Sequence, residues 1–177
     1  RGGGSFQVTA EHTAVVNSRV FALAGGLFGG TGAEAGNAVT STVQAGVGSS
    51  VTVLAKGISV EAINHVSKPA LGGSNIDGTA GGLIAGGGAD STTTLNLSTV
   101  TSVGSQTSLR VLGTAGAPGA LSLRALNDLA LYDKVTFTTA GALSGLGAFS
   151  TIRTVNDLAR VQIGSGSTLS SVGAINL

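Results

Sequence analysis

The chain contains no cysteine, methionine or tryptophan, and only 3% of its residues are aromatic. Without cysteine it has neither a disulfide framework nor thiolate chemistry. Charged residues make up 10% of the sequence, against about 25% in typical soluble proteins. The net charge of +1 leaves no basic stripe that could neutralise phosphates, so we expect no nucleic-acid partner.

No apolar run approaches the length of a membrane span. The best candidate, residues 20–30 (VFALAGGLFGG), is far shorter than the roughly 20 residues that cross a bilayer. Arg19 before it and small residues after it imitate a signal peptide, and Gly26 and Gly30 have the spacing of helix dimers in lipid. Because a similar phrase recurs downstream, we interpret the run as a repeat element and expect no membrane span.

Small and aliphatic residues take the place of aromatic ones. Thirty residues are glycine and 42% are hydrophobic, which sets the chain apart from disordered sequences. Large aromatics normally fill a wide core, so a core of Ala, Val, Leu and Ile indicates a narrow, repetitive interior.

The sequence repeats with a period of about 55 to 60 residues. One apolar–x–apolar–x–Ala phrase occurs in FQVTAEH (6–12), GISVEAINH (57–65) and LSLRALND (121–128), and INL (175–177) begins it again. A second set aligns Leu27, Leu83 and Leu143, followed by Val39, Leu95 and Val155 and then by Val47, Val103 and Ile163. We divide the chain into units at 6–57, 58–120 and 121–174, with a fourth beginning at 175.

The local periodicity is that of short strands. Apolar and polar residues alternate, and Gly- or Ser-rich corners separate the alternating segments, as at 48–50, 104–108 and 164–167. Together with the in-phase repeats, this predicts an all-β parallel β-solenoid whose coils lie about 4.8 Å apart. We expect about three coils per unit, hence roughly nine coils and a rod on the order of 40 Å long, in a single segment over residues 1–177.

Insertions and polar columns are expected on this rod. Residues 71–82, after Pro69, are predicted to bulge as a loop. Asn64, Asn127 and Asn156 are candidates for stacked amides. The threonines at 92–94 and 138–139 are interpreted as solvated strand positions or exposed ladders.

The apolar–x–apolar–x–Ala phrase, followed by a Gly/Ala-rich segment and then by Val-Gly-Ser and Val-x-Val, resembles the repeats of large secreted bacterial surface proteins. These are the filamentous-haemagglutinin-like and leukotoxin-like filamentous adhesins. The resemblance covers nearly the whole chain and implies a right-handed parallel β-helix, export across the envelope, an extracellular location at the bacterial cell surface, and a role in a stalk or fibre. It brings no catalytic residues.

The acidic residues show no catalytic pattern. Glycan-cleaving β-helices need paired carboxylates or an acid-held metal, but most carboxylates here lie alone among small residues. The densest cluster is in the third unit, where NDLA occurs at 127–130 and 156–159 near Asp133, Lys134 and Arg160. We interpret the Asn-Asp pairs as turn formers at solenoid corners, with a binding groove as the alternative.

No metal or cofactor site is expected. His12 and His65 are one place apart in repeat phase, but three intervening coils would separate them by roughly 14 Å. GGSNIDG (72–78) is a single degenerate copy of a calcium-binding nonapeptide, which works by repetition. The Gly-rich segments lack the lysine and helix of a phosphate loop. We therefore assign no catalytic, cofactor-binding or metal-ligating residue.

Two functions remain open. The first is a non-catalytic structural or adhesive segment of an extracellular fibre, a slice of a longer repetitive protein or a protomer that stacks head to tail. Its expected partners are repeats of the same chain or identical protomers, with surface glycans or matrix components as ligands. The alternative is a glycan-binding or glycan-cleaving β-helix, which would need a groove with two charged residues in reach of each other. Ice binding is weaker, because the threonines do not recur at one column.

Overall fold

The computed structural model describes residues 3–72 and 75–177, and this part of the chain contains β-strands and no helix. Each repeat unit supplies four strands, which together form one coil. The first coil consists of β1 (Phe6–Val15), β2 (Val20–Ala24), β3 (Phe28–Val47) and β4 (Thr52–Ala55). The second consists of β5 (Ile58–Lys68), β6 (Ile76–Gly81), β7 (Ile84–Val103) and β8 (Ser108–Val111). The third consists of β9 (Leu121–Leu131), β10 (Val135–Ala140), β11 (Leu143–Ile163) and β12 (Thr168–Ser171), and β13 (Ile175–Asn176) begins a fourth.

Equivalent strands of successive coils pair in parallel. They form four sheets with the orders β1-β5-β9-β13, β2-β6-β10, β3-β7-β11 and β4-β8-β12. The expected columns lie in register: Phe6 pairs with Ile58, Ile58 with Leu121, and Leu121 with Ile175. The prediction of an all-β, parallel-stranded chain is confirmed, and the stacked coils are consistent with a β-solenoid.

The prediction of nine coils is wrong. Since Phe6 pairs directly with Ile58, each unit is one large coil, and three coils make a stack roughly 14 Å deep. The strands are also much longer than expected: β3 and β7 each have 20 residues, which corresponds to roughly 65 Å. The first halves of these strands alternate glycine with small residues, so they show no hydrophobic alternation and look like loops in the sequence.

A β-bulge shifts the second set of columns by one residue. Leu143 pairs with Ile84 rather than with Leu83, and Thr154 rather than Val155 pairs with Leu95. The register changes between Thr154 and Asn156, after which Asn156 pairs with Asn96 and Ile163 with Val103. The expected alignments of Leu143 with Leu83 and of Val155 with Leu95 are therefore each wrong by one residue. An ungapped comparison of the units cannot allow for the extra residue of a bulge.

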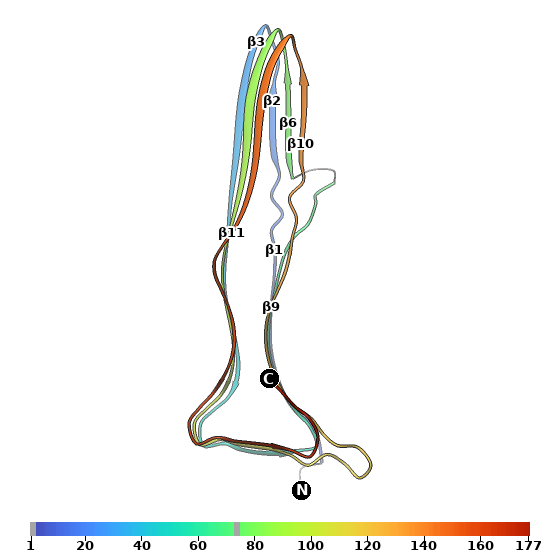
Figure 1. Ribbon diagram of the computed structural model, residues 1–177, viewed down its shortest axis with the longest axis vertical. Coiled ribbons are helices and arrows are strands. Elements are labelled where there is room, and N and C mark those ends of the chain that lie inside the picture. Colours follow the sequence, from blue (N-terminus) through green and yellow to red (C-terminus); the bar gives the residue numbers. More distant parts are fainter. Residues whose placement is uncertain (1–2, 73–74) are drawn as a thin grey trace.

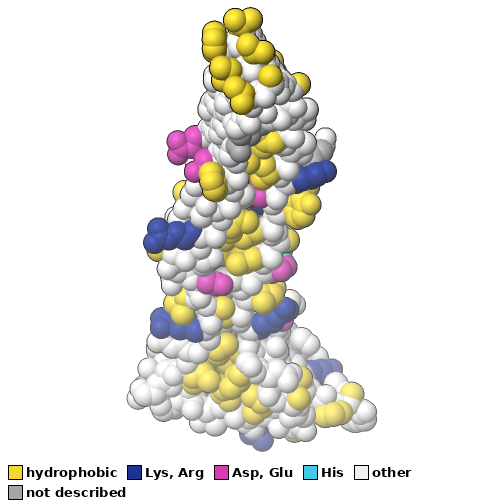
Figure 2. All heavy atoms as spheres, turned by 45° about the horizontal axis from the view of Figure 1, so that its top comes forward, with side chains coloured by type: hydrophobic (Ala, Val, Ile, Leu, Met, Phe, Trp, Pro, Cys, Tyr) yellow, Lys and Arg dark blue, Asp and Glu magenta, His cyan; other side chains and the backbone are white. Residues whose placement is uncertain are grey.

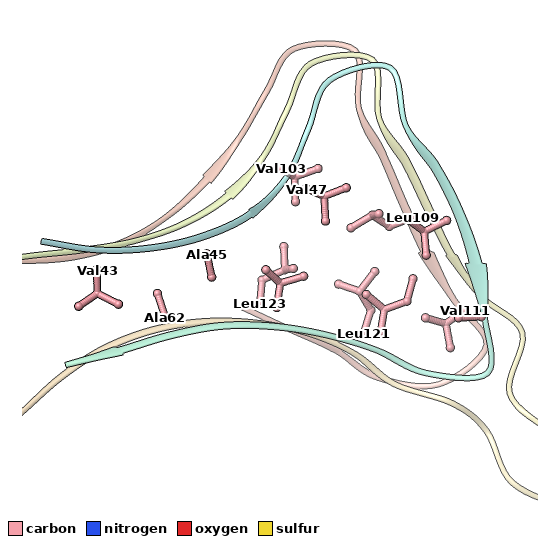
Figure 3. Packing of buried hydrophobic residues seen from close by; sticks show 13 residues of the cluster. Val43, Ala45, Val47, Ala62, Val103, Leu109, Val111, Leu121 and Leu123 are labelled. Atoms are coloured by element: carbon pink, nitrogen blue, oxygen red, sulfur yellow. The ribbon is translucent and has the colours of Figure 1, made fainter. Parts of the chain in front are cut away.

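Each coil is tall and narrow, with a triangular base (Figure 1). In the base, three sheets surround the main hydrophobic core, and Figure 3 shows Val43, Val103, Leu109, Leu121 and Leu123 pointing into the space between them. Above the base, only two layers face each other, so the interior holds small side chains such as Ala85 and Ala89. The narrow interior explains why the sequence has so few large aromatics.

The insertions of the second coil lie in two places. Strand β6 belongs to a sheet, so residues 76–81 of the predicted loop are not an insertion, and residues 73–74 lie outside the described residues. Most of the extra length instead lies between β8 and β9, where residues 112–120 protrude from the base (Figure 1). This second loop contains Pro118 and an isolated antiparallel bridge between Thr114 and Ala117.

The polar columns are partly as predicted. Asn64 and Asn127 stack, with Nδ2 of Asn64 3.5 Å from Oδ1 of Asn127. Asn156 belongs to another sheet and pairs with Asn96, so its place in that stack was wrong. Thr93 points inward and is buried, in contrast to the expectation of solvated threonines.

Candidate functional site

A chain of hydrogen bonds crosses the interior above the base and links all three coils. Ser41 on β3 donates to Oδ1 of Asn64 on β5 at 3.2 Å, and Nδ1 of His12 lies 3.0 Å from the same oxygen. Farther along the stack, Thr99 on β7 donates to Oδ1 of Asn127 on β9 at 2.5 Å. These bonds satisfy the side-chain amide of buried Asn64. We call this chain of hydrogen bonds the polar ladder, and it fixes the register of two facing sheets.

The ladder continues into the third coil through the second NDLA segment. Nδ2 of Asn127 donates to Oδ1 of Asp157 at 2.5 Å and to the carbonyl of Leu158 at 3.2 Å. Both NDLA segments lie inside strands, β9 and β11, so the interpretation as corner turns is wrong. The structure brings the two segments together across the interior, where they join facing sheets.

A buried ion pair lies where the coil narrows. Nζ of Lys68 donates to Oδ2 of Asp133 at 2.6 Å, and the two side chains are 0% and 3% exposed. The ammonium also donates to Ser91 at 3.1 Å and to Thr93 at 2.8 Å, so its three N–H groups have partners. Asp133 accepts a further bond from Ser150 at 2.6 Å, while its other oxygen is buried without a partner among the described residues.

Ionisable side chains also stack on the outer face of the sheet that contains β1, β5 and β9. Nδ1 of His65 lies 2.9 Å from Oδ2 of Asp128, and Nε2 lies 3.6 Å from Oε1 of Glu11. His12 points to the other face of the same sheet, into the polar ladder. The predicted separation of His12 and His65 by three coils is wrong, because they belong to adjacent coils; they lie on opposite faces.

An acidic hollow lies on the outer face of the sheet that contains β3, β7 and β11. Glu34 pairs in register with Asp90, and Asp90 pairs with Phe149. These three side chains and the backbone of Gly32 and Gly88 border a hollow of about 450 Å³. The sequence had suggested that the carboxylates lie alone. The alignment of Leu27 with Leu83 already places Glu34 over Asp90, and this was the signal that could have found the pair.

The described residues contain no group of three or more His, Cys, Asp or Glu side chains that could hold a metal ion. Part of the GGSNIDG segment, residues 73–74, lies outside the described residues. Its Asn75 is buried and structural: Nδ2 donates to the carbonyl of Pro69 at 2.9 Å, and Oδ1 accepts from the amide of Lys134 at 3.2 Å.

The third coil exposes much of the interior surface that the second coil buries, whereas inward side chains of the first coil such as Val43 and Val47 are only 5% and 7% exposed. Val103 of the second coil is 2% exposed, whereas Ile163, its partner in the third coil, is 41% exposed. Ile76 is 0% exposed and its partner Val135 is 37% exposed. We call the two ends of the stack the first-coil face and the third-coil face. Along most of their length, the described strands at each end pair with a neighbour on one side only.

Comparisons with known proteins give no match: no protein-family profile, no curated protein and no solved structure is significantly similar to this chain. In the part of the chain that the structure describes, no helix has the length and apolar character needed to cross a membrane.

Proposed function

We propose that the chain is a segment of a right-handed β-solenoid that serves as a non-catalytic structural or adhesive part of an extracellular fibre at the bacterial cell surface. The resemblance of its repeat pattern to the repeats of filamentous-haemagglutinin-like adhesins supports this role. So does the geometry, because coils that pair in parallel, in register except at the bulge of β11, extend in one direction by simple addition.

The observation that carries the proposal is the exposure of the third-coil face. The third-coil face presents apolar side chains, such as Ile163 at 41% and Ile152 at 40% exposure, beside the free edge of the 21-residue strand β11. A strand edge of this length is a template for another strand. A further coil, from the same chain or from an identical protomer, would bury these side chains as the third coil buries those of the second.

The polar residues of the two faces are complementary. Asn127 and Asp157 lie on the third-coil face, and His12 and Ser41 lie at the same height on the first-coil face. A protomer that stacks in phase would set Asp157 against Ser41 and His12 and so continue the polar ladder. Strand β13 already covers the start of β9, at Leu121 and Ser122, so pairing with the incoming β1 would begin beyond these two positions.

Electron microscopy and fibre diffraction test this proposal. We expect concentrated protein to form unbranched filaments with a meridional reflection at about 4.8 Å, the spacing of stacked parallel strands. The variant Asp157→Lys should shorten or abolish them, since it removes the carboxylate that would face Ser41 and His12 and puts a cation in its place. A purified chain that stays monomeric at every concentration, with protected amides along β11, would contradict stacking of protomers.

The acidic hollow favours a second candidate, a glycan-binding or glycan-cleaving β-helix. Such a protein needs a groove in which two charged residues reach each other, and Glu34 and Asp90 meet this condition. A depolymerisation assay on a panel of polysaccharides, run with the wild type and with Asp90→Asn, separates the two candidates. The fibre proposal predicts no cleavage by either protein.

A further inference from the structure

The acidic hollow lies at one side of a trough that has no side chains on its floor. The outward positions next to it, in all three coils, are glycine: Gly30, Gly86 and Gly145 in one column and Gly32, Gly88 and Gly147 in the next. The apolar column of Phe28, Ile84 and Leu143 forms the other side, toward the narrow end of the molecule. Figure 2 shows apolar side chains gathered at this narrow end and acidic side chains below them.

Folding does not require these glycines. None of the six has a backbone angle that side chains avoid, and a Cβ added at Gly86 or Gly88 would lie 3.6 Å from the nearest atom, which is ordinary contact. An added Cβ at Gly145 would meet nothing within 4 Å. Glycine within a strand nevertheless lowers stability by about 0.5–1 kcal/mol relative to alanine. Glycines of this kind mark places where a ligand or another backbone approaches closely.

The charges beside the trough also reduce stability. Glu34 and Asp90 lie directly opposite each other on adjacent strands, where like charges repel. Among the residues that the structure describes, neither carboxylate forms an ion pair. Oδ1 of Asp90 is buried and has no hydrogen-bond partner among them. A buried carboxylate oxygen without a donor is costly, so this carboxylate also weakens the free protein.

The third member of the same column is Phe149, whose side chain is 69% exposed. An aromatic ring beside two carboxylates is a poor setting for a metal ion, which requires further oxygen ligands. It suits an organic cation, because the ring face attracts ammonium and guanidinium groups. Guanidinium fits best: its fork of N–H donors reaches two carboxylates at once, and its plane stacks on an aromatic ring.

We propose that the acidic hollow binds an arginine side chain of an extended peptide from a partner protein, with the peptide backbone lying along the glycine trough. The guanidinium donates to the carboxylates of Glu34 and Asp90 and stacks on Phe149. The trough admits the backbone because no Cβ stands on its floor. Three features that weaken the free protein thus combine in one site: strand glycines, paired like charges and an exposed aromatic ring.

The first experiment is a titration of the full chain, observed by amide NMR, with the acetylated peptide amide GGRGG. The control peptide replaces arginine by citrulline, which has the same shape and no charge. We expect saturable shifts in β3 and β7 around the hollow, and binding of the citrulline peptide that is weaker by about tenfold or more. Equal binding of the two peptides, or shifts spread over other acidic residues, would overturn the proposal.

Variants of the protein identify the site. Glu34→Gln should weaken binding of the arginine peptide by about tenfold or more, whereas Glu61→Gln, which changes the net charge equally on another sheet, should leave it unchanged. Gly88→Thr should stabilise the fold and yet weaken binding, because its side chain fills the trough. Equal effects of Glu34→Gln and Glu61→Gln would refute the site.

Competition distinguishes the arginine peptide from other occupants. Calcium chloride and a chitin oligosaccharide are titrated in separate arms against the preformed peptide complex. Ionic strength is held constant throughout the titration. We expect neither compound to displace the peptide. If either saturates the hollow and the arginine peptide fails to bind, the proposal is wrong. Filament formation is measured on the same samples as a separate readout of the fibre proposal, because the peptide contacts the outer side of the sheet and stacking uses the strand edges.

Discussion

Replacing Lys68 by methionine removes one half of the buried ion pair and leaves Asp133 charged in the interior. The Asp133 side chain is 3% exposed and would keep only the hydroxyl of Ser150 as a close donor, since Ser91 lies 3.5 Å away. Breaking a buried pair in this way costs about 3–5 kcal/mol. That is a large part of the about 5–15 kcal/mol by which a typical domain is stable.

The double variant Lys68→Met/Asp133→Leu should behave very differently. It removes both charges and fills the space with apolar side chains, so the desolvation cost of the ions disappears with their attraction. Such replacements are often neutral or stabilising, by about 1–4 kcal/mol. Ser91 and Thr93 lose their bonds from Lys68, and this offsets part of that gain.

Urea unfolding at 25 °C, followed by circular dichroism, gives the free energies for a double-mutant cycle. Lys134→Met is the matched control: Lys134 is exposed and its loss should change stability by about 0.5 kcal/mol or less. Hydrogen exchange should show the loss of protection in Lys68→Met first in β9 and β10, on either side of Asp133. A cost below about 1 kcal/mol for Lys68→Met would refute the burial of this pair.

Three further predictions concern backbone geometry and the polar ladder, each measured by the same urea unfolding assay. Gln106→Gly should stabilise the protein by about 1 kcal/mol, because Gln106 has a φ of 58° and Gly166 holds the equivalent corner with a φ of 70°; destabilisation would contradict this. Gly104→Ala should destabilise it by about 1–3 kcal/mol, because its Cβ would overlap backbone atoms of Ser49; a neutral result would exclude this close approach. Asn64→Leu should cost about 1–3 kcal/mol, since it leaves polar groups of the ladder without partners, and a stable variant would show that water replaces the amide.

Residues one coil apart could be identified from the sequence. Phe6, Ile58, Leu121 and Ile175 occupy one column because parallel strands place equivalent residues against each other, so the same kind of side chain fits at each level. The alternation of buried and exposed residues followed from the same pattern. The adhesin resemblance and the fibre function drawn from it stay predictions.

Contacts across the interior could not be identified in this way. Lys68 is in register with Leu131, so the repeat alignment already places Asp133 two positions further along in the next coil; what the sequence did not show is that Ser91 and Thr93 of the facing sheet enclose the pair. The two NDLA segments looked like turns, because Asn and Asp favour turns locally, and their pairing across the interior overrides that preference. The bulge at Val155 likewise depends on how β11 fits against β7.

The sequence by itself determined the columns, the parallel stacking and the narrowness of the interior, because these depend on one residue matching its equivalent in the next coil. The tertiary structure alone decided that each unit is one coil of long strands rather than three small ones. It also placed Phe149 beside the acidic pair, because β11 is shifted by one residue and Phe149 pairs with Asp90 rather than with Ala89. The physical reason is that a repeat in sequence reports what lies above and below a residue, whereas the cross-section of the coil decides what lies opposite it.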